Sequence, residues 1–314
     1  MVNKKSAYLK IMIAMSIVGV FVALNKTAAA SLPIFLFSEL RLGIAAIILT
    51  IILVKKEKRF PPLIKKDAFV LFVQAFLGVF LFSISLLLGS KYTSAIESGI
   101  ITSLTPALVA LVSIFIFKEK LSSRQKLGIG IALTGVLIIN IFGLTGNVSW
   151  TVYSLIGNAL ILLAVTGEAF FVTFGRLVSK EISPLAISTI VVTIGAVLSL
   201  PFALLEAATF DFTQITGKDL FLVMYSAVPV SVVAVLLINQ SAKVLPAGST
   251  AVFTAFMPVS AITVSCLFLG EKLLWFHVLG IACVLFSILM VSSNSRKRSG
   301  ITKQIKFNLL RRHG

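Results

Sequence analysis

The apolar residues of this 314-residue chain gather into long runs separated by short polar segments. A helix needs about 20 largely apolar residues to cross a bilayer. None of the runs alternates between apolar and polar residues as the strands of a membrane barrel do. The pattern therefore predicts an all-α membrane protein. Its ten transmembrane helices are expected at residues 8–29, 34–54, 68–88, 94–117, 124–142, 152–178, 184–206, 219–241, 247–269 and 275–293.

An internal repeat predicts how these helices are arranged. Residues 91–129 match residues 243–281 without a gap, and 12 of the 39 positions are identical. The second copy falls five helices after the first, so the two copies cross the membrane in opposite directions. We therefore predict two inverted five-helix repeats, at residues 1–142 and 143–293, followed by a basic tail at 294–314. Inverted halves of this kind are typical of secondary transporters, which work by alternating access around a shared site.

Composition and charge support this interpretation. Hydrophobic residues make up 58% of the chain and charged residues 12%, and the mean hydropathy is +1.07. The formal net charge is +17. With the N-terminus in the cytoplasm, the inner connections and chain ends carry 23 Lys and Arg residues, whereas the outer ones carry three. This pattern predicts a plasma-membrane protein with both termini in the cytoplasm. The expected partner of the basic charge is an anionic inner leaflet, not nucleic acid.

Four charged residues fall within the outer parts of predicted helices one, two and four: Lys26, Glu39, Arg41 and Glu97. A charge at the bilayer centre costs at least about 2.5 kcal/mol on insertion scales, so each needs a reason. We expect a structural ion-pair network. One alternative is an outer gate that breaks and re-forms during transport. Another is capture of a substrate carboxylate by Lys26 or Arg41, of which arginine is better suited to a two-pronged contact.

Glu168 lies slightly past the middle of the predicted sixth helix. A carboxylate at that depth is a candidate for binding a coupling proton or a substrate amine, and the alternative is a structural pair with a basic residue. Three uncharged polar residues, Asn25, Gln74 and Asn239, are further candidates for substrate binding. Hydrogen bonding between helices is the more common use of such side chains.

Two prolines and two glutamates recur in the repeat. Pro106 and Pro258 fall near the middle of helices four and nine, where each removes a backbone donor and frees a carbonyl. They are predicted to be hinges that expose a carbonyl to the substrate, or else fixed kinks. Glu119 and Glu271 follow at the helix ends, where we expect each to anchor the bend into the next helix through local backbone or basic partners.

The sequence offers little for catalysis. It contains no HExxH, GxSxG or GxxxxGK[ST] motif. Its histidines and cysteines, His277, His313, Cys266 and Cys283, lack metal-ligand spacing. We therefore predict no metal, no cofactor and no enzymatic activity, with a proton or other ion gradient, exchange, or the substrate's own gradient as the energy source. An intramembrane enzyme or a non-transporting scaffold is the disfavoured alternative.

The repeated motif is similar to that of a known family. Pro106 followed by Glu119-Lys120-Leu121 and Gly128, and the copy at Pro258, resembles the EamA-type branch of the drug/metabolite transporter superfamily. The resemblance extends over residues 8–293. It implies ten helices around a central cavity and movement of small polar metabolites, often export of amino acids or related compounds. Efflux of drugs or organic cations is the alternative, and it is based on Glu168 and an aromatic lining of the cavity. A tryptophan common in that family before Gly19 is absent here.

Overall fold

The protein is described by a computed structural model. Within the described residues every regular element is helical, and six helical segments are long and apolar enough to span a bilayer. The described residues are 4–58, 61–92, 101–102, 104–143, 152–268, 275, 278–283 and 285–287. Within these ranges, the backbone alone is described at residues 25–30, 136, 139–143, 154, 262 and 265–268.

Five long uninterrupted helices lie close to their predicted positions. Because lipid can satisfy no backbone hydrogen bonds, the apolar runs form helices almost to their ends. The predictions for helices one, two, five, six and seven are confirmed in α1 (Lys4–Ser31), α2 (Ile34–Glu57), α7 (Ser123–Gly143), α8 (Val152–Phe174) and α9 (Pro184–Ala207). The predicted fourth and tenth helices lie partly outside the described residues.

The third and eighth helices have the predicted extent but not the regular form that the apolar runs suggest. The third is α3 (Lys65–Ala75), η1 (Phe76–Leu81) and α4 (Phe82–Tyr92), and η1 is a wide π-helical segment. The eighth is α10 (Gly217–Tyr225), the π-helical η3 (Ser226–Ala234) and α11 (Val235–Ala242), preceded by a single 3-10 turn η2 (Phe212–Gln214). With the 152-residue offset of the repeat, η1 falls within η3. Such segments occur frequently at functional sites.

The fourth and ninth helices are both broken just before their prolines. In the ninth, α12 (Ala247–Thr254) ends at Ala255 and α13 (Phe256–Phe268) continues beyond it. In the fourth, α6 (Thr105–Phe115) begins after a turn at Leu104. Proline lacks an N–H and its ring clashes with the carbonyl four residues earlier, which explains the position of both breaks. The interruption predicted at Pro106 and Pro258 is therefore present, whereas movement about it stays a prediction.

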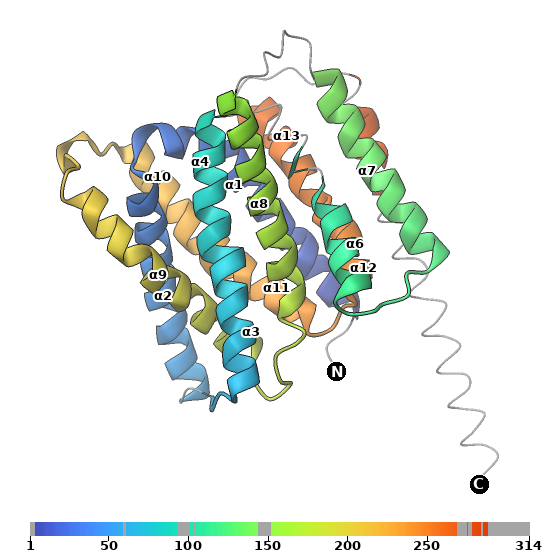
Figure 1. The fold of residues 1–314 in the computed structure, drawn as a ribbon, viewed down its shortest axis with the longest axis horizontal. Coiled ribbons are helices and arrows are strands. Elements are labelled where there is room, and N and C mark those ends of the chain that lie inside the picture. The colour runs from blue at the N-terminus through green and yellow to red at the C-terminus, as the bar shows by residue number, and fades with distance from the viewer. Residues whose placement is uncertain are drawn as a thin grey trace.

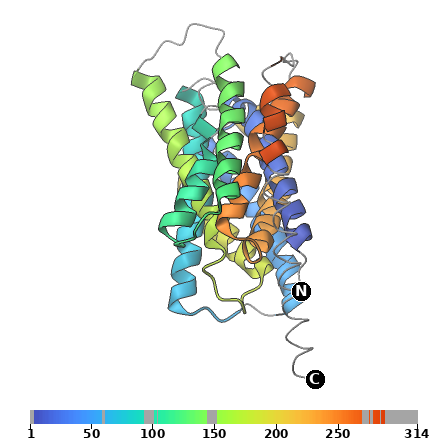
Figure 2. The ribbon, with the colours of Figure 1, turned by 90° about the vertical axis from the view of Figure 1, so that its right-hand side faces the viewer.

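The helices form a single bundle in which neighbours come from both repeats. α2 packs on α9, α4 on α8, α1 on α13 and α6 on α12 (Figures 1 and 2). The connections α2–α3, α6–α7, α8–α9 and α11–α12 all lie at the lower end in Figure 1, which we call the basic end. The Lys and Arg residues that they bring there include Lys58, Lys118, Lys120, Arg176, Lys180 and Lys243. The chain therefore gathers on one side the charges that the positive-inside pattern assigns to the cytoplasm.

Candidate functional site

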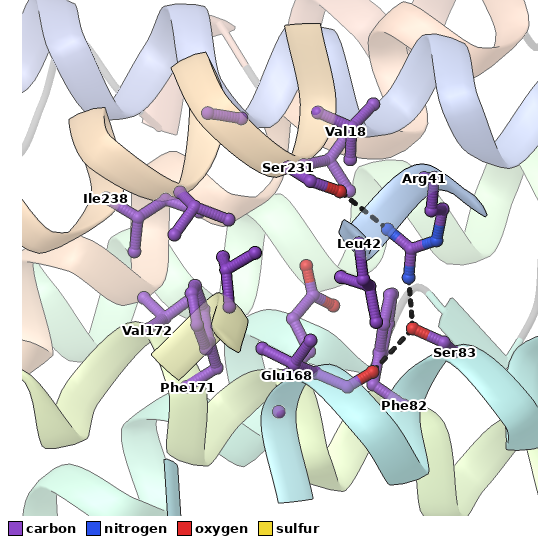
Figure 3. A pocket seen from close by; sticks show the side chains of 16 residues that line it. Val18, Arg41, Leu42, Phe82, Ser83, Glu168, Phe171, Val172, Ser231 and Ile238 are labelled. Carbon is purple, nitrogen blue, oxygen red and sulfur yellow. Dashed lines mark hydrogen bonds between the residues drawn. The ribbon is translucent and has the colours of Figure 1, made fainter. Parts of the chain in front are cut away.

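A small cavity lies between the two halves of the bundle (Figure 3). It is lined from the first half by α1, α2, η1 and α4, and from the second half by α8, α9, η3 and α11. Its volume is about 60 Å³, which is room for about four water molecules. Pockets that enclose an organic ligand measure about 300 Å³ or more, so a metabolite fits only if the surrounding helices move apart. Four of the 16 lining residues are polar: Arg41, Ser83, Glu168 and Ser231.

Arg41 extends from α2 into this cavity and is only 4% exposed. Its Nη1 donates a hydrogen bond of 2.9 Å to Ser231 Oγ, and its Nη2 donates to Ser83 Oγ. The ring of Phe21 lies 5.5 Å from the guanidinium carbon. The Nε atom is buried and has no hydrogen-bond partner among the described residues. The guanidinium is thus held in place, while one of its three nitrogens is left without a partner there.

The two serines that hold Arg41 lie in or next to the π-helical parts of the third and eighth helices: Ser231 is in η3, and Ser83 is in α4, two residues after the end of η1. Ser83 Oγ donates to the carbonyl of Val79 in η1 at 2.5 Å, and Ser231 Oγ donates to the carbonyl of Ser226 in η3 at 2.9 Å. Each hydroxyl hydrogen is therefore committed to its own helix, and a lone pair is left for the guanidinium. The irregular segments in the two halves thus aim one acceptor each at the same cation.

Among the described residues Arg41 has no carboxylate partner, although an acidic residue lines the same cavity. Arg41 and Glu168 are both described, and they form no ion pair with each other. The two serines are neutral, and burying a charge without a counter-charge is costly. The cavity is therefore electrostatically prepared for an anionic group beside Arg41.

Glu168 projects from α8 into the cavity and is 6% exposed (Figure 3). Its Oε2 lies 3.2 Å from Thr105 Oγ1, at the start of α6. The same Thr105 oxygen lies 2.8 Å from the carbonyl of Thr102, which is the carbonyl that Pro106 leaves without a backbone donor. Thr105 Oγ1 can donate its one hydrogen to Glu168, to the carbonyl of Thr102, or to both as a shared bond. The helix break and the carboxyl group are therefore linked through one threonine.

Comparison with known proteins identifies the kind of protein that holds this cavity. Residues 5–141 and residues 155–293 each match the EamA-like transporter family. The chain belongs to this family. It is 45% identical over 286 residues to the uncharacterized transporter YetK of Bacillus subtilis (strain 168), covering 91% of this chain and 86% of YetK. It is 29% identical over 267 residues to the uncharacterized transporter YyaM of the same organism, covering 84% of this chain and 86% of YyaM.

Solved structures agree with this assignment at the level of the fold. One described only as "Crystal structure of protein" superposes with a TM-score of 0.77 at 15% sequence identity, covering 94% of this chain and 98% of the other. The resemblance drawn from the repeated motif is thus confirmed. The protein is a multi-pass membrane protein of the EamA-like transporter family.

Gln74 and Asn239 are brought together in this EamA-like transporter, but they do not line the cavity. Gln74 Nε2 donates to Asn239 Oδ1 and to the carbonyl of Phe171, both at 3.0 Å. Asn239 Nδ2 donates to Ser188 Oγ at 3.1 Å. The two amides thereby connect α3, α8, α9 and α11 next to a residue of the cavity wall. These contacts are of the interhelical kind that is common for such side chains.

The predicted network of outer charges is only partly within the described structure. Arg41 and Glu39 do not pair with each other. Arg41 faces the cavity, and the buried Oε2 of Glu39 has no hydrogen-bond partner in the part of the chain that the structure describes. The side chains of Asn25 and Lys26 and the whole of Glu97 lie outside the described residues.

Sequence reasoning missed Ser83 and Ser231 as site residues. Hydroxyls in membrane helices usually bond back to their own helix, and these two do so as well, so composition gave no sign that they also hold Arg41. The usable signal was their location in matching helices of the two halves.

Proposed function

We propose that the protein is a secondary active transporter that moves small amino-acid-like metabolites across the plasma membrane by alternating access. The observation that supports this most is a buried cavity between the two halves in which Arg41 and Glu168 are not paired with each other. A zwitterionic substrate would place its carboxylate on the guanidinium of Arg41 and its ammonium group on Glu168. One small molecule would then compensate both buried charges.

The free Nε of Arg41 supports binding of a carboxylate. A carboxylate that approaches the edge of the guanidinium could accept from Nε and from one Nη atom in place of a serine. Paired hydrogen bonds of this kind are the strongest that arginine makes with planar anions. Lysine offers a single charge without this fork, so Arg41 and Lys are not interchangeable here.

The position of Thr105 supports a proton as the coupling ion. A protonated Glu168 could donate to Thr105 while Thr105 donates to Thr102, whereas Glu168 would need to be ionised to bind a substrate amine. Proton and substrate would then compete for one carboxyl group, and each would leave as the other binds. A proton gradient could drive the substrate in the opposite direction by this exchange, since a ligand shifts an equilibrium only through differential binding.

Other features support the proposed direction of transport and the proposed orientation in the membrane. The basic end would face the cytoplasm with both chain termini, and residues 1–142 and 143–293 would be the two repeats that exchange conformations. Export of the substrate is part of the proposal because the family resemblance favours it. The small cavity also supports alternating access, since the substrate fits only after one side has opened.

A second candidate function is efflux of organic cations. Most of the cavity wall is apolar, and it includes the rings of Phe82 and Phe171 near Glu168. A hydrophobic cation would bind to an acidic group and an apolar wall, but it would make no favourable interaction with the positive charge of Arg41.

Untargeted comparison of metabolites inside and outside cells that express the protein tests both candidates. Cells with the wild-type protein should accumulate amino-acid-like compounds in the medium, and Arg41→Gln and Glu168→Gln should each abolish the difference. If organic cations are exported instead, Glu168→Gln should abolish export while Arg41→Gln retains it. No difference between cells with and without the protein would contradict the proposal. The exposed Glu181, on the α8–α9 connection, provides a control substitution to Gln.

A further inference from the structure

Both repeats are joined at the basic end by a cluster around Glu119. Its Oε2 accepts hydrogen bonds from Ser113 Oγ at 2.8 Å and from the backbone N–H of Gly248 at 3.1 Å. Its Oε1 accepts from Arg176 Nη1 at 2.5 Å and from the backbone N–H of Ala247 at 3.4 Å. Glu119 was expected to anchor a local bend, and it does pair with a basic residue. Its backbone partners, however, lie about 130 residues further along the chain, at the start of α12.

The local backbone is shaped to bring these groups together. Lys118 adopts a left-handed conformation with φ of 51°, which turns the chain back after α6 so that the Glu119 side chain reaches Ser113. A side chain at Gly248 would run into Leu121, so a glycine there lets α12 approach closely. Arg176 also lies over the ring of Phe117, with 4.8 Å between the guanidinium carbon and the ring centroid.

Electrostatics favour an ionised Glu119 in this setting. Burial alone would raise the pKa of Glu119, but the Gly248 N–H, the Ser113 hydroxyl and Arg176 outweigh burial, and the pKa lies below its ordinary value. The carboxylate also lies at the N-terminus of α12, where unpaired backbone N–H groups favour negative charge. The cluster is therefore charged and closed at neutral pH.

The cluster is linked to the cavity through α6. At its start, α6 is attached to α8 through Thr105 and Glu168. At its other end, the chain after α6 is attached to the chain after α8 through Glu119 and Arg176. The half-helix α6 packs along α12, the first half of the ninth helix in the other repeat, and both are interrupted at the end away from Glu119. A change in the bonding of Glu168 can therefore be transmitted through α6 to the cluster around Glu119, which holds the two halves together.

We propose that Glu119, Ser113, Arg176 and the start of α12 form the gate that closes the cavity toward the basic end. Two inverted halves can open on one side only if their contacts on that side separate. α6 and α12 are the half-helices that meet there, and the Glu119 carboxylate is the group that bonds to both. Opening requires these bonds to break, so Glu119 sets the balance between closed and open states. This inference rests on the proposed alternating access but on no particular substrate.

Accessibility of a single cysteine tests the gate without any substrate. The background is Cys266→Ala with Cys283→Ala, and the probe is Ile238→Cys, which replaces a residue of the cavity wall on α11. A membrane-impermeant maleimide is added from the basic end of the reconstituted protein. Charge-assisted hydrogen bonds are individually strong, so Glu119→Gln should raise the labelling rate about fivefold to tenfold. Arg176→Gln should raise it less, because the bonds of Glu119 to Ser113 and α12 remain.

Controls keep the result interpretable. Glu181→Gln removes an exposed glutamate from the same end and should leave labelling unchanged. Thermal unfolding of each variant shows whether it folds. If Glu119→Gln does not fold, the milder variant Ser113→Ala is labelled in its place. The proposed gate would be overturned if a folded Glu119→Gln variant, or Ser113→Ala used in its place, were labelled at the wild-type rate. Equal acceleration of labelling from the opposite end would overturn it too, since that result indicates general loosening. Absence of amino-acid transport would contradict the proposed substrate and would leave the gate standing.

Discussion

Replacing Arg41 with methionine separates the two accounts of this residue, a binding group or a structural one. A buried ion loses several kcal/mol of hydration in real proteins. Hydrogen bonds to a charged group return about 1.5–3 kcal/mol each, and Arg41 has two, to Ser83 and Ser231. Both serine hydrogens are already donated to Val79 and Ser226, so removing the guanidinium strands no donor.

The expected change in stability is therefore near zero or favourable. Replacing buried ionic groups with apolar ones of similar volume is often neutral or stabilising by about 1–4 kcal/mol. Binding should change in the opposite sense, because loss of one partner of a buried charge pair costs about 2–5 kcal/mol. Arg41→Met should thus unfold at the wild-type temperature or above it, while transport falls by at least about 30-fold.

Thermal unfolding of the purified protein and transport into proteoliposomes are the two measurements. Arg41→Lys is the matched control, because lysine keeps the positive charge but cannot make the paired hydrogen bonds of a guanidinium. This variant should retain weak transport. The reasoning is refuted if Arg41→Met melts well below the wild-type protein, because Arg41 would then stabilise the fold. It is also refuted if the variant folds and transports normally.

Three further predictions concern the contacts made by Thr105, Gly248 and Gln74. Thr105→Val should lose transport and Thr105→Ser should restore it in the same proteoliposome assay, because the hydroxyl links Glu168 to the helix break; equal activity of both would contradict the link. Gly248→Ala should change the free energy of unfolding by less than about 1 kcal/mol, because its Cβ would meet only the end of the Leu121 side chain, which can turn away, and alanine favours the helix; a larger loss in thermal unfolding would show that Leu121 cannot move. Gln74→Leu should destabilise by about 1–3 kcal/mol by stranding Asn239, and adding Asn239→Leu should cost little more; two independent losses would contradict the pairing.

The positions of the helices could be predicted because lipid leaves the chain few choices. Apolar runs such as those that became α2 and α9 must form helices, and their lengths are set by the bilayer. The prolines also act locally, so the breaks next to Pro106 and Pro258 follow from the sequence. The prediction of two inverted repeats required only a count of helices between the two copies of the repeat, and no knowledge of how they pack.

The parts that could not be predicted depend on how the helices rotate and meet. Arg41 and Glu168 lie 127 positions apart, and nothing in the apolar pattern brings them to one cavity. The π-helical segments change which side chains of the third and eighth helices point toward the cavity. The hydropathy of the sequence does not reveal such a change. Glu119 appeared to be a local anchor because its partners Arg176 and Gly248 are neighbours only in the folded bundle.

A comparison of substrate analogues in proteoliposomes tests the central claim most directly. Labelled amino acids would be offered alongside two analogues of each, the amine that lacks the carboxylate and the acid that lacks the amino group. The account predicts that the wild-type protein carries at least one of the amino acids and neither of its analogues, because Arg41 and Glu168 each need a partner. Transport of the amine as fast as that of the amino acid would contradict it.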